Sequence, residues 1–220
     1  MPLINLGDAY NTKKDSKVYQ ARSEDRANLA SVSKEYGYEY WDGDRKYGYG
    51  GYHYIEGYWT ETAKQIIEHY HLNNDSSVLD IGCGKGYLLY EIKKLLPQIK
   101  VAGLDISDYA IADSKEEIRP YLSVGVAQSL PYENSEFDLV LCLSVLHNLY
   151  LYDLKEALLE IKRVSKKDSW ISLVSYTNEQ EKANLINWGL TVECFFTPKE
   201  WEFLFDEWGY MQDYSFRIFT

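Results

Sequence analysis

The stretch Val78-Leu79-Asp80-Ile81-Gly82-Cys83-Gly84-Lys85-Gly86 is the most informative segment of this 220-residue chain. A short apolar run ends at an acid, and glycines then alternate with other residues before residues 87–92, whose pattern predicts a helix. Glycines let a backbone turn sharply and approach a ligand closely, because they have no Cβ. The first turn of the following helix points unpaired N–H groups at the same place. The stretch therefore predicts a nucleotide-type binding turn between a strand and a helix.

The spacing of the glycines distinguishes two kinds of nucleotide site. A dinucleotide fingerprint reads G-x-G-x-x-G, whereas here the third glycine, Gly86, comes one residue earlier and Tyr87 takes the expected position. The pattern of an acid followed by G-x-G-x-G resembles the first motif of class I S-adenosylmethionine-dependent methyltransferases. In that family the acid and the glycine backbone hold the amino-acid end of the cofactor. The resemblance implies that S-adenosylmethionine, and its product S-adenosylhomocysteine, bind to Asp80, Gly82, Cys83, Gly84 and Gly86.

A second acid follows the next predicted strand. Residues 101–106 form an apolar run in which Asp105 stands 19 residues after Gly86. A carboxylate at this point can accept hydrogen bonds from both ribose hydroxyls, with Ile106 beside the adenine. The alternative for Asp105 is a helix cap, since Ser107 and Asp108 open the next helical stretch. The resemblance favours ribose binding.

Residues 125–132 and 137–143 resemble two further segments of the same family, G-D-A-x-x-L-P-F and F-D-x-V. The acid that contacts the adenine amino group in the family is replaced here by Val126. The resemblance therefore implies that Ala127 and Gln128 contact the adenine. It also implies that Leu143, at the end of the following strand, contacts the cofactor. It covers residues 60–176 well and the remainder loosely.

Strand and helix patterns alternate along the chain. Strands are predicted over 77–81, 101–106, 122–127, 137–143 and 170–176, and helices over 86–96, 109–118 and 153–165. Such repeats predict a parallel sheet with helices on both faces. A strand over 191–196, a helix over 198–208 and a strand over 211–219 match the last elements of the family. We expect a Rossmann-like α/β fold with a seven-stranded, mostly parallel sheet whose last strand is antiparallel.

Residues 36–59, here called the aromatic segment, are rich in tyrosine and glycine. The tyrosines provide flat walls tipped with hydroxyls, and Arg45 provides a planar fork that matches phosphate or carboxylate. We expect residues 1–59 to form an N-terminal arm and aromatic cap over the active site, and residues 60–220 to form the cofactor-binding domain. The segment loosely resembles the lead-in of small-molecule methyltransferases from bacterial surface-polysaccharide or modified-sugar pathways. The predicted acceptor-binding residues are Arg45, Tyr47, Tyr49, Tyr52 and Tyr176.

Another interpretation of the aromatic segment is a hairpin that packs on the domain. In that case Arg45 and Lys46 would merely offset the charges of Asp42 and Asp44.

Two histidines could accept a proton from an acceptor hydroxyl. His147 follows the strand predicted over 137–143, where members of the family line the cleft and often carry a histidine, and His53 lies within the aromatic segment. Histidine has a suitable pKa, and a general base contributes roughly 10²–10⁴-fold to the rate. The alternative for His147 is a packing residue or the start of a helix. The predicted catalytic residues are His147 and His53.

Composition restricts the class of partner. The net charge of −11 and the pI of about 4.9 argue against nucleic acid or an anionic membrane as substrate, because both rely on clustered Lys and Arg. The three cysteines have no metal-ligand spacing, and an odd, scattered set fits a reducing cytoplasm. No charged-then-apolar leader and no long apolar run is recognised. We expect a cytoplasmic monomer or homodimer without a metal.

The expected function is the transfer of a methyl group from S-adenosylmethionine to a small polar acceptor, anionic or sugar-like, at an oxygen atom. Two alternatives within enzymes stay open at this point: N-methylation of an amino acid or amino sugar, and methylation of a protein. An alternative of another class is a cofactor-binding protein that has the same fold and no catalytic activity.

Overall fold

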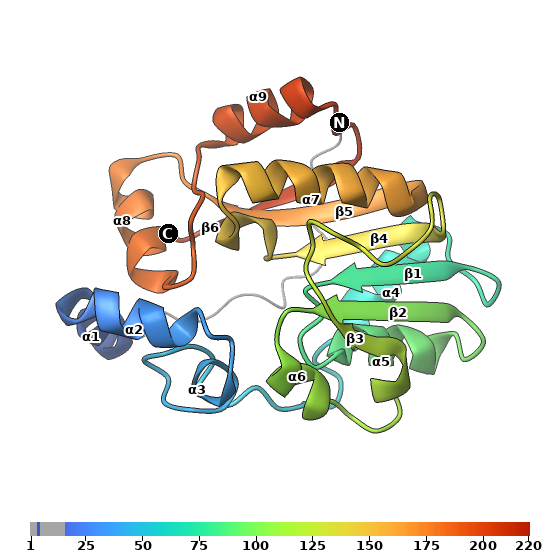
Figure 1. The fold of residues 1–220 in the computed structure, drawn as a ribbon, viewed down its shortest axis with the longest axis horizontal. Helices are drawn as coiled ribbons and strands as arrows, with labels where there is room; N and C mark the ends of the chain where they lie inside the picture. The colour runs from blue at the N-terminus through green and yellow to red at the C-terminus, as the bar shows by residue number, and fades with distance from the viewer. Residues whose placement is uncertain (1–3, 5–15) are drawn as a thin grey trace.

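The computed structural model of the chain describes residue 4 and residues 16–220. In that part of the chain, six strands form one sheet in the order β3-β2-β1-β4-β5-β6, and all neighbouring strands run parallel (Figure 1). The strands are β1 Ser77–Ile81, β2 Lys100–Asp105, β3 Leu122–Val124, β4 Phe137–Leu143, β5 Ser165–Ser175 and β6 Asp213–Ile218. The α-helices are α1 Ser16–Glu24, α2 Arg26–Ser33, α3 Tyr38–Trp41, α4 Thr60–His69, α5 Tyr87–Leu95, α6 Asp108–Ala112, α7 Leu151–Val164, α8 Glu179–Trp188 and α9 Pro198–Trp208. Two short 3₁₀ helices are η2 Arg119–Tyr121 and η3 Leu146–Asn148.

Strand β4 is buried on both faces and shows how the layers are built. Successive side chains of a strand point to opposite faces of the sheet. Val140 and Cys142 belong to the hydrophobic cluster that contains residues of α7 and α9, whereas Leu139 and Leu141 belong to the cluster that contains residues of α4 and α5. Helices therefore cover both faces, as predicted, and the carboxyl ends of the strands are left for a ligand.

The predicted seven-stranded sheet with an antiparallel last strand is wrong. Residues 191–196 form no strand, and they pair with the sheet only through an isolated parallel bridge between Phe196 and Ser175, at the end of β5. Helix α9 starts next to this bridge, at the carboxyl end of β5, and carries the chain back toward the amino end of that strand. Strand β6 therefore begins with Asp213 beside Trp170 and runs parallel to β5. A helical crossover of this kind joins parallel strands, whereas an antiparallel strand would need a direct reversal.

The helix signals that predicted α9 are all present. The Thr197 hydroxyl accepts a hydrogen bond from the Glu200 N–H, and the Glu200 carboxylate accepts one from the Thr197 N–H at 2.8 Å. Pro198 occupies the first turn, and Gly209 ends the helix with a φ of 65°. These local contacts are what make this boundary predictable from the sequence.

Other boundaries agree to different degrees. β1 and β4 have the predicted bounds, whereas α6 ends at Ala112 and β3 ends at Val124, both earlier than predicted. β5 begins at Ser165, directly after α7. Helix α8 is not predicted by the sequence pattern. No helix in the described chain is both apolar enough and long enough to span a bilayer.

The predicted N-terminal arm lies partly outside the described residues, because residues 1–3 and 5–15 are not among them. Helices α1, α2 and α3 lie beside the carboxyl edge of the sheet (Figure 1). Helix α4 begins at Thr60, at the boundary that we expected between the two parts. The division into two domains stays a prediction.

Two polar clusters fasten the aromatic segment to the sheet domain. The ammonium group of Lys85, which is fully buried, lies 2.6 Å from the carboxylate of Asp42. The carboxylate of Glu91 in α5 accepts a hydrogen bond from the Thr60 hydroxyl at 2.6 Å and another from the Tyr54 hydroxyl. Buried polar bonds of this kind are costly to break, because the remaining partner would stay desolvated.

Candidate active site

The turn between β1 and α5 has the backbone that its glycines predict. Gly82, Gly84 and Gly86 have φ angles of 72°, 57° and 71°, which residues with a Cβ rarely adopt. A Cβ on Gly82 would lie 2.1 Å from a methyl group of Val145, and one on Gly84 would lie 2.9 Å from the indole of Trp41. Neighbouring side chains therefore pack directly onto the turn. Gly82, Cys83 and Gly84 line a cavity, and Gly86 is the N-cap of α5 outside that lining.

The two predicted carboxylates stand at one end of this cavity, whose volume is about 450 Å³. Asp80 is the penultimate residue of β1 and Asp105 is the last residue of the neighbouring parallel strand β2, and they are 5% and 6% exposed. One Asp105 oxygen accepts the Gly84 N–H at 2.7 Å, and the other accepts the Ser107 N–H at 2.8 Å. Ser107, rather than Asp105, caps α6, because its hydroxyl accepts the Ala110 N–H at 3.0 Å. Asp105 is therefore fixed to the glycine turn and open to a ligand.

Burial dominates the electrostatics of these acids. It raises the pKa of Asp80 to about 8, with a further contribution from the charge of Asp105. Burial also raises the pKa of Asp105, although the N–H groups of Ser107, Gly84 and Ile106 oppose the rise. A cationic ligand would stabilise both ionised carboxylates, whereas a pyrophosphate would be repelled. The pair suits a ligand that carries an ammonium or sulfonium group.

Apolar side chains beside Asp105 face the cavity. Ile106 and Val126 are 54% and 37% exposed, and both line it. The Oε1 atom of Gln128 is buried and has no hydrogen-bond partner among the described residues. Apolar walls next to an unsatisfied acceptor fit a flat base that carries an amino group. The other predicted cofactor residues on this lining are Cys83, Ala127 and Leu143.

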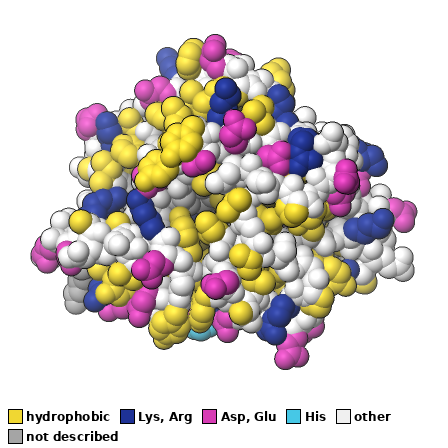
Figure 2. All heavy atoms as spheres, viewed as in Figure 1, with side chains coloured by type: hydrophobic (Ala, Val, Ile, Leu, Met, Phe, Trp, Pro, Cys, Tyr) yellow, Lys and Arg dark blue, Asp and Glu magenta, His cyan; other side chains and the backbone are white. Residues whose placement is uncertain are grey.

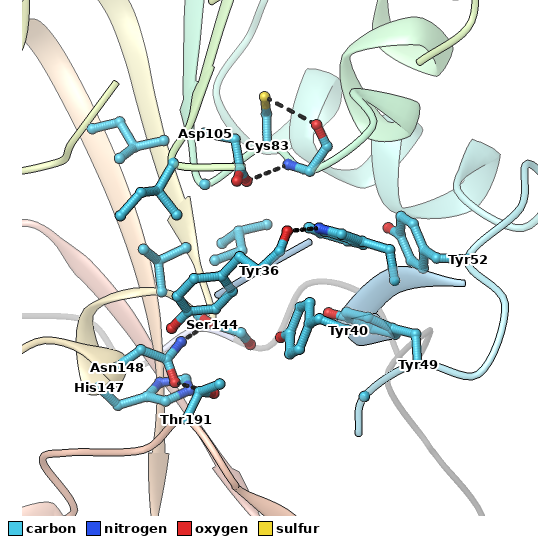
Figure 3. A pocket seen from close by; sticks show the side chains of 18 of the residues that line it. Tyr36, Tyr40, Tyr49, Tyr52, Cys83, Asp105, Ser144, His147, Asn148 and Thr191 are labelled. Atoms are coloured by element: carbon cyan, nitrogen blue, oxygen red, sulfur yellow. Dashed lines mark hydrogen bonds between the residues drawn. The ribbon is translucent and has the colours of Figure 1, made fainter. Parts of the chain in front are cut away.

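Trp41 joins the aromatic segment to this end of the cavity. Its indole N–H donates to the Ser107 hydroxyl at 2.9 Å, and its ring packs against Gly84. Tyr49 stacks on Trp41 with ring centroids 5.2 Å apart and an angle of 7° between the planes, and Tyr52 lies against both rings. The rings form one wall of the cavity, on which Tyr40, Tyr49 and Tyr52 are seen in Figure 3.

Of the remaining residues that were predicted to contact the acceptor, three line the cavity and one does not. Arg45 and Tyr47 line the cavity, and Arg45 donates to the carbonyl of Gly48. His53 also lines it, but its side chain is 75% exposed and its Nδ1 lies 3.9 Å from the Asp42 carboxylate. The prediction for Tyr176 is not supported, because its ring leaves the cavity and packs between Phe195 and Lys182 beside α8.

His147 lies in η3, directly after β4, and is 1% exposed. Its ring lines the cavity, and its Nδ1 has no hydrogen-bond partner in the described part of the chain. Burial, and then the positive charge of Arg217, lower the pKa of His147 to about 3. The imidazole is therefore neutral at physiological pH, and its Nδ1 is a buried polar atom whose hydrogen-bonding capacity is unused in the described part of the chain.

Next to His147, a hydrogen-bonded network of three polar residues lines the cavity. The Thr191 hydroxyl donates to Asn148 Oδ1 at 2.8 Å, and Asn148 Nδ2 donates to the Ser144 carbonyl at 3.3 Å. Ser144 has a φ of 62°, a strained conformation of the kind that gathers at functional sites. Figure 3 shows His147 and this network across the cavity from Asp105, with Tyr36 between them. The cavity thus has an Asp105 end and a His147 end.

Several residues of the lining are not predicted from the sequence, and four of them bear on the argument below. These four come from α1, the end of α8, the loop after it and β6, and they are Arg22, Trp188, Thr191 and Arg217. No local motif marks them, because each reaches the cavity only through the packing of segments that are distant in the chain.

Comparisons with known proteins agree with this geometry. A model of the methyltransferase domain family matches residues 72–211, well over half of the chain. The demethylmenaquinone methyltransferase of Lactiplantibacillus plantarum is 30% identical over 162 residues, which cover 68% of this chain and 67% of that protein. The arginine-hydroxylase NDUFAF5 of Mus musculus is 35% identical over 91 residues, 41% of this chain and 26% of that protein. The solved structure of YcgJ from Bacillus subtilis has a TM-score of 0.55 and 21% identity over 66% of each chain, a likeness that shows the fold.

The chain belongs to the methyltransferase domain family. The predicted class, a class I S-adenosylmethionine-dependent methyltransferase, is confirmed, and so is S-adenosylmethionine as its cofactor. The chain spans 26% and 37% of the lengths of two of the curated relatives that it matches. The shared region is therefore common to proteins of different size and with different reactions, and the acceptor has to be argued from this cavity.

Proposed function

We propose that this protein transfers the methyl group of S-adenosylmethionine to a small polar acceptor, anionic or sugar-like, at an oxygen atom. The observation that carries the proposal is one cavity of about 450 Å³ with two buried carboxylates at one end and a buried, neutral His147 at the other. Its size falls within the range of small-molecule sites. The two ends differ in charge, as a cationic cofactor and a separate acceptor require.

At the Asp105 end, each predicted cofactor residue has a chemical role. Asp105 would accept hydrogen bonds from the ribose hydroxyls, and Asp80 would lie near the ammonium group of the methionine part. Ile106 and Val126 would flank the adenine, and Gln128 Oε1 would accept a hydrogen bond from its amino group. This assignment gives the unsatisfied Gln128 acceptor a partner and neutralises the buried acids.

At the His147 end, the acceptor hydroxyl would meet a neutral imidazole. Methylation of a hydroxyl forms a carbon–oxygen bond and breaks the bond from the methyl carbon to sulfur, which leaves S-adenosylhomocysteine as the product. The hydroxyl proton passes to water. With a pKa of about 3, His147 holds that proton only weakly. Aligning acceptor, methyl carbon and sulfur can contribute about 7–11 kcal/mol, more than the roughly 10²–10⁴-fold of a general base. We therefore assign His147 mainly to orienting the hydroxyl.

The charge of the protein supports a small molecule over a nucleic acid as acceptor. The chain has 23 Lys and Arg against 34 Asp and Glu. On the face seen in Figure 2, basic and acidic side chains of the described residues are interspersed. Binding to a polyanion relies on clustered cations and counterion release.

Incubation with methyl-labelled S-adenosylmethionine and a bacterial extract tests the proposal. Small molecules, proteins and nucleic acids are separated afterwards, and the label is counted in each fraction. We expect label in the small-molecule fraction and little with Asp105→Ala. Label in the protein fraction would instead favour a protein methyltransferase, and label in no fraction despite cofactor binding would favour a non-catalytic binding protein.

A further inference from the structure

Three arginines line the cavity, and the charge of one of them, Arg217, lowers the pKa of His147. Arg22 comes from α1, Arg45 from the aromatic segment and Arg217 from β6, and all three line the cavity. Like charges repel one another, and they repel more strongly where water is excluded. Their convergence therefore has a cost that another interaction has to offset.

Trp188 contacts two of these arginines, and its ring lies between Arg217 and His147. The guanidinium of Arg217 lies 5.2 Å from the centre of the Trp188 ring, and Arg22 donates to the Trp188 carbonyl. The Trp188 ring in turn lies 6.4 Å from the His147 ring. Arg217 and the buried imidazole thus share one end of the cavity.

Arg45 joins the same cluster through Tyr49. Burial raises the pKa of the Tyr49 hydroxyl, the positive charges of Arg217 and Arg45 oppose that rise, and the negative charge of Asp105 adds to it. Both guanidinium groups therefore act on one hydroxyl that lines the cavity. A ligand beside Tyr49 would be within electrostatic reach of both.

No acidic side chain in the described part of the chain pairs with Arg22 or Arg45. Arg22 is 3% exposed and donates to the carbonyls of Lys46 at 3.0 Å, Arg45 at 3.1 Å and Gly48 at 3.3 Å. Burial, and then the charge of Arg45, lower the pKa of Arg22 to about 10, so it stays charged at neutral pH. Within the described residues, the hydrogen bonds recorded for these two neighbouring cations therefore go to backbone carbonyl groups.

We infer that Arg22, Arg45 and Arg217 form an anion site, and that the acceptor carries a phosphate or carboxylate group in addition to the atom that is methylated. The inference rests on the proposed function and narrows its acceptor from an anionic or sugar-like molecule to one with an acidic group. Arg22 fixes the loop of Arg45 through its carbonyl bonds, and the planar forks of Arg45 and Arg217 match the oxygens of either acid. A phosphate or carboxylate group bound there offsets the repulsion among the arginines. The rest of the acceptor molecule then extends toward His147.

Thermal unfolding with simple anions tests the site without the natural acceptor. Wild-type protein is titrated with inorganic phosphate, with malonate and with neutral glucose at constant ionic strength. We expect phosphate or malonate to raise the midpoint in a saturable way, and glucose to leave it unchanged. The anion with the larger shift at equal concentration identifies the preferred acidic group.

Arg45→Gln and Lys46→Gln form a matched pair for this test. Both remove one positive charge from the same loop, but Lys46 pairs with Asp44 and does not line the cavity. Arg45→Gln should weaken anion binding at least tenfold, and Lys46→Gln should bind anions like the wild type. Arg217→Gln, on a different element, should reproduce the loss.

Two results would overturn the anion site: absence of a saturable shift with either anion, or equal binding by Arg45→Gln and Lys46→Gln. Titration of the same proteins with S-adenosylhomocysteine separates this outcome from a failure of the proposed function. A wild type that binds S-adenosylhomocysteine but no anion would overturn the anion site alone. A wild type that does not bind S-adenosylhomocysteine would overturn the proposed function.

Discussion

The ammonium group of Lys85 lies 2.6 Å from the carboxylate of Asp42 and thereby joins the glycine turn to the aromatic segment. Lys85 is fully buried and also lies 2.8 Å from the Asp113 carboxylate. Asp42 accepts the Tyr52 N–H at 2.8 Å as well. The aromatic wall of the cavity is therefore attached to the turn that binds the cofactor.

Asp42→Asn should loosen this attachment. The substitution leaves Lys85 with Asp113 as its carboxylate partner, and we expect the free energy of unfolding to fall by about 1–3 kcal/mol. Asp44→Asn is the control, because its side chain is 60% exposed on the same loop and its loss should change stability by less than about 0.5 kcal/mol. Urea unfolding measures both, and equal stabilities of the two variants would show that the Lys85–Asp42 pair is unimportant.

Asp80 should make the stability of the ligand-free protein depend on pH. Its folded pKa of about 8 lies well above the value of about 3.9 in an unfolded chain. The folded state binds the proton more tightly, so the stabilising contribution is complete below pH of about 4. It is lost as the pH rises toward 8, by up to about 1.4 kcal/mol per pH unit.

Asp80→Asn removes this titration, and urea unfolding at pH 5, 7 and 9 measures the consequence. Relative to the wild type, the variant should gain stability steadily from pH 5 to pH 9. A difference that stays constant over this range would contradict the raised pKa.

Gln128 should recognise the amino group of adenine through its unsatisfied Oε1. Gln128→Leu removes one buried hydrogen bond, worth about 1–2 kcal/mol, and should weaken S-adenosylhomocysteine roughly 5–30-fold. An analogue in which hypoxanthine replaces adenine lacks the amino group, so its affinity should change little. Calorimetry with both ligands decides the matter: equal losses would mean that Gln128 supports the loop and does not read the base.

His147 should make the protein less stable in acid. Its folded pKa of about 3 lies below the usual value of about 6.5, so the unfolded state binds the proton more tightly. The stability present above pH of about 6.5 is lost as the pH falls toward 3. His147→Gln should reduce this loss, which unfolding midpoints between pH 4 and pH 7 would show. Parallel curves for the two proteins would contradict the buried, neutral imidazole.

The Asp105 end of the cavity is more predictable from the sequence than the His147 end. Asp80 and the glycines form one contiguous motif, and positive φ angles at those glycines follow from local chemistry. Arg22 and Arg217 instead reach the cavity from opposite ends of the chain, and no local pattern encodes such a meeting. The strand at β6 was predicted, but its parallel direction was missed for the same reason, because its pairing with β5 depends on the path of α9.

Tyr176 illustrates a different failure. Its position after a strand of the sheet predicts a place at the ligand edge. The unpredicted helix α8 follows immediately, and the ring turns away to pack with Phe195 and Lys182. The end of a strand fixes where a backbone lies, whereas the direction of the next side chain depends on what packs beside it.

Calorimetric titration of the wild-type chain with S-adenosylhomocysteine, alongside NAD⁺, tests the central claim most directly. We expect one saturable site for S-adenosylhomocysteine, no comparable binding of NAD⁺, and at least a tenfold loss of affinity in Asp105→Ala, which removes charged hydrogen bonds worth about 1.5–3 kcal/mol each. Failure of S-adenosylhomocysteine to bind, or tighter binding of NAD⁺, would contradict it.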